Sequence, residues 1–262
     1  MVDFFQKIED YTIPAAKMRM PHKPLIQVMP ASLRKSENSP QDIERAQMLE
    51  AWLKRHRGHL NHTRLDRTEL CVDGFPRSAN SLLCRKIIET AGYTNRTLSH
   101  HIHKRHNIEC AVLANIPTIV PVREPEACIK SYLVYTGGKF GGGMFQHYIE
   151  MLEFVILYKS AATVALFEEI TSDYASIVKR ANRMYGDILT LPTVSDTELN
   201  DNIANKVATE SQHEEKKFYR EGVPNKSRDS LKQEYATFVR SHPQLSRCRS
   251  LYEKILQIAA DQ

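Results

Sequence analysis

A segment of small and turn-forming residues between an apolar run and a helical pattern has the composition of an anion-binding loop. It extends from Cys71 to Leu83, with Gly74 and Pro76 where the chain must turn. Small side chains after the turn would let backbone N–H groups face an anion at the start of the helix, where the positive end of the helix dipole also points. The sequence therefore predicts a phosphate loop, with N–H groups from Ser78, Ala79, Asn80 and Ser81.

This loop differs from the nucleoside triphosphatase version, G-x-x-x-x-G-K-[ST]. Asn80 stands where that pattern has its lysine, and a cation lies instead inside the loop, at Arg77. We therefore expect the charge that grips an anion to lie close to the turn. An ordinary strand-to-helix turn is the alternative.

A second apolar run, from Pro117 to Val122, also ends in a cation, Arg123, and is followed by a helical pattern. Arg123 would stand at the carboxyl end of a parallel strand, where open α/β sheets bind their ligands. Ser131 follows eight residues later. Arginine suits a phosphate because it stays charged and presents paired donors. Alternatively, Arg123 forms a local salt bridge and Ser131 only packs.

Strand and helix patterns alternate through the middle of the chain and predict a three-layer α/β sandwich with a central parallel sheet. Helical additions are expected at both ends, and the domains are predicted as an irregular and helical extension over 1–60, packed on an α/β domain over 61–262. Strands are expected over 69–73, 96–99, 117–122 and 162–170, and helices over 40–57, 80–91, 125–135, 145–160 and 171–183, with two more in 227–262 separated by Pro243.

Composition restricts the class of protein. The chain has 262 residues, 42% of them hydrophobic, which is enough for one sizeable core. A formal net charge of +5 suits anionic ligands but is too small and dispersed to predict nucleic-acid binding. The five cysteines form no C-x-x-C pair, and no signal or membrane-spanning pattern is present. We expect a cytoplasmic protein that binds neither nucleic acid nor membrane.

The two motifs together resemble sulfotransferases that use 3′-phosphoadenosine 5′-phosphosulfate (PAPS). The resemblance covers about residues 69–183 and is carried by the strand, the loop around Arg77, the following helix, and Arg123 with Ser131. It implies a fold like that of the P-loop nucleoside triphosphate hydrolases, PAPS as cosubstrate and no required metal. It also implies in-line sulfuryl transfer to a hydroxyl or amine of a small-molecule or glycan acceptor, with Arg77 as a catalytic residue that stabilises the charge on the departing 5′-phosphate. The donor carries anions at opposite ends, so one loop cannot hold both.

A run of histidines could supply the general base that an acceptor hydroxyl needs. In the sulfotransferases that this chain resembles, the base precedes the 3′-phosphate arginine by about the distance that separates His101 from Arg123, which is 22 residues. His100 and His103 are alternatives. His101, His103 and His106 could instead bind zinc, or the run could face solvent.

The chain also departs from the family pattern. Leu82 stands where many members have tryptophan, so Phe167 is a candidate aromatic wall for adenine or else a core residue. The family's carboxyl-terminal Arg-Lys-Gly segment is not obvious. A basic segment could replace it and close over the 3′-phosphate through Arg228, with Arg220 and Lys226, or could be a solvated loop.

A glycine-rich segment over 137–143 must be free in its backbone angles and is either a lid or acceptor wall, or a plain connector. Two other functions stay open. A P-loop kinase or nucleotide hydrolase would need magnesium and a lysine that the loop lacks. A catalytically silent nucleotide- or polyanion-binding protein would bind without turnover.

Overall fold

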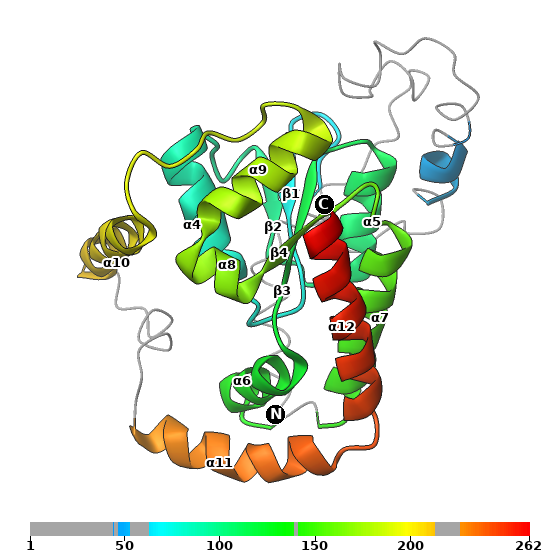
Figure 1. Ribbon diagram of the computed structural model, residues 1–262, viewed down its shortest axis with the longest axis vertical. Helices are drawn as coiled ribbons and strands as arrows, with labels where there is room; N and C mark the ends of the chain where they lie inside the picture. Colours follow the sequence, from blue (N-terminus) through cyan, green and yellow to red (C-terminus); the bar gives the residue numbers. More distant parts are fainter. Residues whose placement is uncertain (1–43, 45–46, 53–62, 139–140, 213–225) are drawn as a thin grey trace.

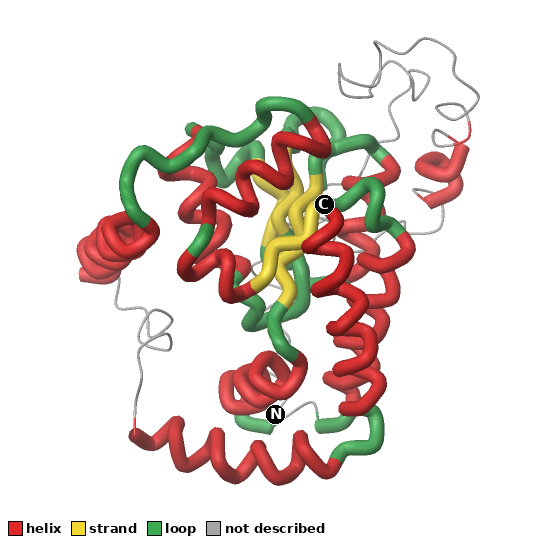
Figure 2. The backbone as a smooth tube through the Cα atoms, viewed as in Figure 1, coloured by secondary structure: helices red, strands yellow, loops and turns green. Residues whose placement is uncertain are grey.

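The computed structural model describes residues 44, 47–52, 63–138, 141–212 and 226–262, without the side chains of 210–212 and 226–232. Four parallel strands form one sheet with helices on both faces (Figures 1 and 2). The predicted α/β fold with a central parallel sheet is confirmed. None of the described helices combines the length and apolar character needed to cross a bilayer.

The strand order is β2-β1-β3-β4, so the chain leaves β1 in one direction and then crosses back to place β3 on its other side. Cys71 pairs with Ser99 of β2 and with Thr118 of β3, which makes β1 a central strand. In such a sheet the crevice between the carboxyl ends of β1 and β3 is the place where ligands bind. The strands are β1 (Leu70–Val72), β2 (Leu98–His100), β3 (Thr118–Val122) and β4 (Thr163–Leu166).

Helices bury the two faces of the sheet in separate clusters. Leu70 and Val72 face one cluster, whereas Cys71 between them faces another, as the two-residue period of a strand requires. Covering the first face are α4 (Asn80–Ala91), α8 (Phe167–Ser172) and α9 (Tyr174–Tyr185), and covering the second are α5 (Arg105–Leu113), α7 (Gly143–Leu157) and α12 (Leu245–Asp261) (Figure 1). Outside these layers lie α6 (Pro125–Thr136), α10 (Asp196–Gln212) and α11 (Lys226–Ser241).

The strand predicted over 162–170 is too long. β4 ends at Leu166, and α8 begins at Phe167. Glu169 ends the strand because its carboxylate accepts the N–H of Leu166 at 3.0 Å, which caps the new helix, and it also pairs with Arg180. The helix predicted over 171–183 corresponds to α9, which begins at Tyr174, and most of α8 occupies residues that were predicted as strand.

The other predicted elements agree with the structure to within a few residues, including the two helices separated by Pro243. Among the described residues, three helices were not predicted, α5, α8 and α10. The pattern of α5 was obscured because it directly follows the histidine run. Of the helix predicted over 40–57, residues 44 and 47–52 are described and are helical, and the rest lies outside the described residues, as do residues 1–38.

Part of the glycine-rich segment lies against the carboxyl-terminal helices. A Cβ at Gly138 would approach the hydroxyl oxygen of Tyr235 to 2.6 Å, and one at Gly142 would lie 3.0 Å from Nε2 of His242. These two glycines therefore allow close packing against α11 and the turn after it. In Figure 1, α6 and α11 lie together at the end of the sheet towards which β3 runs.

A buried lysine ties α10 to the first helical layer. Lys86 of α4 is fully buried and forms an ion pair with Asp196, and its Nζ lies 5.5 Å from the ring centroid of Tyr174. Asp196 also accepts the backbone N–H of Tyr174 at 3.1 Å. This pairing supplies the counter-charge without which a buried ammonium group would be costly.

Candidate functional site

The candidate site lies at the carboxyl ends of β1 and β3, where the strand order changes direction. The loop between β1 and α4 carries Arg77, and Arg123 directly follows β3. Because β1 and β3 are hydrogen-bonded neighbours, their carboxyl ends bring these two segments together. The structure thus places both predicted cations at the carboxyl ends of the strands, where open α/β sheets generally bind ligands.

The loop has the backbone geometry of an anion-binding nest. Arg77 and Ala79 both have left-handed backbone angles, with φ values of 69° and 66°, and Ser78 lies between them. Alternation of this kind turns successive N–H groups towards one point. Helix α4 begins immediately afterwards at Asn80, with no side-chain cap and no acidic residue in its first turn. Its first N–H groups therefore add to the same positive field.

Side chains of the loop hold its shape. Nδ2 of Asn80 donates to the carbonyl oxygen of Phe75 at 2.9 Å. Ser78 is fully buried, and its hydroxyl lies 3.3 Å from Sγ of Cys128, so the group that it can offer an anion is its backbone N–H. Gly74 makes the turn possible because a Cβ there would lie 2.4 Å from the carbonyl oxygen of Pro121.

Arg77 connects the loop to α6. Its Nε donates to the hydroxyl of Ser131 at 3.2 Å, and its guanidinium carbon lies 5.1 Å from the ring centroid of Tyr135. Ser131 and Tyr135 are one turn apart on α6, so they hold the arginine at two points. The structure therefore brings together Arg77 and Ser131, which the sequence placed in different motifs.

Arg123 joins the same group from the other side. Its Nη1 donates to the carbonyl oxygen of Arg77 at 3.3 Å, and its guanidinium carbon lies 3.9 Å from the ring centroid of Phe167. The hydroxyl of Tyr148 donates to the carbonyl oxygen of Arg123 at 2.5 Å and fixes the backbone there. Phe167 thus lies beside the site, with the guanidinium of Arg123 over the face of its ring.

The histidine run is held in a strained conformation by a buried carboxylate. His101 and His103 have φ values of 60° and 55°, which are unusual for residues other than glycine. Asp73, fully buried at the end of β1, accepts the N–H of Ile102 at 3.2 Å and that of His103 at 3.1 Å. Burial raises the pKa of this carboxyl, and the hydrogen bonds from His103 and Asn107 oppose that rise.

Sequence reasoning missed Asp73. Its signal was an ionisable residue at the carboxyl end of a buried strand, directly before the glycine of the loop. By joining the segment after β1 to the one after β2, Asp73 sets the position of the histidines relative to the loop.

His101, the predicted base, lies on the β2 side of the loop. Its Nε2 lies 2.8 Å from the hydroxyl of Ser81, and its Nδ1 lies 2.5 Å from Nδ1 of His100. The ring of His103 is directed elsewhere, since its Nδ1 donates to the carbonyl oxygen of Gly74 at 2.8 Å. His101 is exposed and so can meet a ligand. Arg228 falls within α11, but its side chain lies outside the described residues, as does all of Arg220.

His147 holds the backbone of the histidine run from α7. Its Nε2 donates to the carbonyl oxygen of His103 at 2.8 Å, and its ring packs 5.0 Å from that of Phe75. Burial, with smaller contributions from nearby cations, lowers the pKa of His147 to about 4, so the imidazole is neutral near pH 7. This second supporting residue was also missed by the sequence reasoning.

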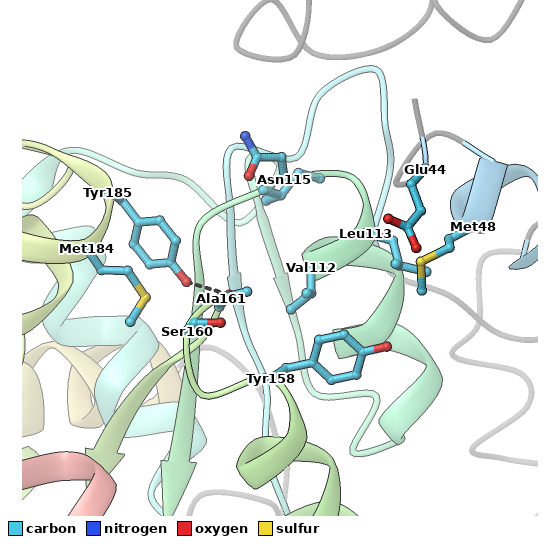
Figure 3. Close-up of a pocket in the computed structure, with 11 residues that line it drawn as sticks. Glu44, Met48, Val112, Leu113, Asn115, Tyr158, Ser160, Ala161, Met184 and Tyr185 are labelled. Atoms are coloured by element: carbon cyan, nitrogen blue, oxygen red, sulfur yellow. Dashed lines mark hydrogen bonds between the residues drawn. The ribbon is translucent and has the colours of Figure 1, made fainter. Parts of the chain in front are cut away.

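A separate pocket lies at the opposite edge of the sheet (Figure 3). It is lined by Ile116, which precedes β3, and by Ser160 and Ala161, which precede β4. A dashed line marks the hydrogen bond from the hydroxyl of Tyr185 to the carbonyl oxygen of Ala161, at 2.8 Å. The pocket therefore lies at the amino ends of the strands, away from the loop and both arginines.

Comparisons of the chain with models of protein families, with curated proteins and with solved structures give no match. The case for a function therefore depends on the geometry of the site and on the motifs that form it.

Proposed function

We propose that this protein is a PAPS-dependent sulfotransferase with a P-loop-like site. The observation that carries the proposal is the linkage of Arg77 and Arg123, two cations from separate motifs, by a hydrogen bond at the ligand-binding edge of the sheet. PAPS has a 5′-phosphosulfate and a 3′-phosphate on the same ribose, so a protein that binds it needs two neighbouring anion sites with room for a sugar between them.

The loop would hold the 5′ end of the donor. Its N–H groups, the start of α4 and the guanidinium of Arg77 all favour an anion there. Arg123 and Ser131 would hold the 3′-phosphate, and the hydroxyl of Ser131 already lies within hydrogen-bond distance of Arg77. Phe167, beside Arg123, offers an apolar surface for the base of the nucleotide.

The reaction would be an in-line transfer. The bond between sulfur and the phosphate oxygen breaks while the acceptor oxygen or nitrogen bonds to sulfur, and the electron pair of the broken bond stays on the departing phosphate. Arg77 and the loop N–H groups would stabilise that charge. His101 would accept the proton of the acceptor, from a position beside Ser81 at the start of α4.

A kinase or nucleotide hydrolase is disfavoured by the role of Asn80. This residue stands where the lysine of a triphosphate loop would be, and its side-chain amide donates inward to the carbonyl oxygen of Phe75. It therefore supplies neither the charge nor the reach of that lysine.

Calorimetry tests the proposal without knowledge of the acceptor. We expect adenosine 3′,5′-bisphosphate to bind the full chain without a metal, and more tightly than ATP with magnesium. A preference for magnesium and ATP would contradict the proposal. To separate an enzyme from a silent binding protein, release of the bisphosphate from PAPS should be measured over a panel of hydroxyl and amine acceptors, with His101→Ala as the inactive variant.

A further inference from the structure

Three side chains with metal-binding atoms converge on the β2 side of the phosphate loop. Cys84 comes from the first turns of α4, His100 ends β2, and His101 follows it. One ligand atom from each lies within 4.8 Å of the others. They come from two segments that are separated in the sequence but lie next to each other in the fold, on the side of the sheet that carries the loop.

We propose that Cys84, His100 and His101 form a binding site for a soft divalent cation, and that Zn²⁺ is the ion it suits best. A thiolate and two imidazoles are donors that zinc prefers, whereas magnesium and calcium prefer oxygen. The zinc grouping considered from the sequence, which included His103, is not the one the structure favours. His103 donates from its Nδ1 to the carbonyl oxygen of Gly74, and Cys84 takes its place.

The three donor atoms are close enough to bind one ion. They lie within 4.8 Å of one another, and zinc bonds of about 2.0–2.3 Å place ligand atoms roughly 3.3–3.7 Å apart, so small side-chain rotations would complete the site. Nδ1 of His100 and Nδ1 of His101 are 2.5 Å apart, so without a metal the two rings share one hydrogen bond. A zinc ion bound to both nitrogens would replace this hydrogen bond and separate them to about 3.3 Å.

The site is accessible to solvent on the side of His101, and hydrogen bonds fix the backbone that carries His101. Cys84 is 4% exposed, whereas His101 is exposed, so an ion would enter past His101. The backbone of His101 is held in its left-handed conformation by the hydrogen bonds that Asp73 accepts from the next two residues. Three protein ligands leave one position for water or an external ligand.

Binding would release a proton. Burial raises the pKa of the Cys84 thiol, so without metal this group is a protonated core side chain. Zinc binds the thiolate, and the thiol proton passes to solvent as the sulfur–metal bond forms.

One consequence rests on the proposed function. A zinc-bound His101 could not accept a proton from the acceptor, so zinc should inhibit sulfuryl transfer. Arg77 and Arg123 are not part of the metal site, so the affinity for adenosine 3′,5′-bisphosphate should be unchanged by zinc.

Cobalt titration of the full, reduced chain without nucleotide tests the site itself. We expect one Co²⁺ per chain, with a near-ultraviolet band from thiolate-to-cobalt charge transfer. Cys84→Ala should abolish this band. Cys110→Ala, which removes another buried thiol on α5, is the matched control and should retain it. Absence of the band in the unaltered chain, or its persistence in Cys84→Ala, would overturn the proposal.

His101→Ala provides a second variant, because His101 is exposed and its replacement leaves the core intact. We expect cobalt affinity to fall more than about 100-fold, since even outer partners of a metal ligand contribute roughly 10–100-fold. Undiminished affinity in this variant would overturn the site even if Cys84→Ala does not fold. Cobalt binding is measured without nucleotide and bisphosphate binding without metal, so failure of one proposal is distinguishable from failure of the other.

Discussion

Nη1 of Arg123 donates a hydrogen bond to the carbonyl oxygen of Arg77 at 3.3 Å. The bond joins the end of β3 to the loop after β1, across 46 residues of sequence. Arg77 in turn donates to Ser131 on α6. The two cations therefore belong to one structural unit, and a substitution in one segment should change the affinity of the other segment for its ligand.

Gly74→Ala should destabilise the protein by about 1–3 kcal/mol, because the added methyl group would lie 2.4 Å from the carbonyl oxygen of Pro121 in a segment that cannot easily move. Urea unfolding measures this change. The matched control is Gly143→Ala at the start of α7, where a Cβ meets nothing within 4 Å, and its stability should be unchanged or slightly higher. Equal stability of the two variants would show that the tight turn is not required.

Asp73→Asn should both destabilise the fold and disturb the histidines. The amide would turn an N–H group towards donors that the carboxylate now accepts from, which costs about 1–3 kcal/mol. Asp66→Asn, at an exposed carboxylate, is the control and should change stability by less than about 0.5 kcal/mol.

If Asp73 positions His101, the Asp73→Asn variant should lose turnover while it keeps its affinity for adenosine 3′,5′-bisphosphate. Parallel loss of both would indicate instead that the whole loop had collapsed.

The position of a site residue could be predicted from the sequence where it depends only on the strand that the residue follows. Arg77 and Arg123 follow apolar strand patterns, and parallel strands bring their carboxyl ends to one edge, so their proximity could be predicted. The end of β4 could not, because Glu169 caps a helix through a bond to Leu166 that strand periodicity does not reveal.

Contacts between elements were equally hidden from the sequence. The approach of Cys84 to His100 depends on how α4 packs against β2, and Asp73 appears in the sequence only as the last residue of the strand predicted over 69–73. Neither has a local pattern that identifies its partner.

Acidification should weaken the fold through His147. The folded protein binds a proton at this residue only near pH 4, whereas the unfolded chain binds it near pH 6.5, so stability is lost as the pH falls through this window. From pH 7 to pH 5, the loss should be about 2 kcal/mol greater than in His147→Gln, whose amide can still donate to the carbonyl oxygen of His103. Urea unfolding at both pH values measures the difference, and an equal loss in the two proteins would exclude His147 as its source.

The most direct test of the two-site account compares adenosine 3′,5′-bisphosphate with adenosine 5′-monophosphate by calorimetry. The unaltered protein should prefer the bisphosphate, since a hydrogen bond to a charged group contributes about 1.5–3 kcal/mol, roughly 10- to 150-fold. Arg123→Ala should lose most of this preference, and Arg96→Ala, at an exposed arginine before β2, should keep it. A preference for the bisphosphate that persists undiminished in Arg123→Ala would contradict the account.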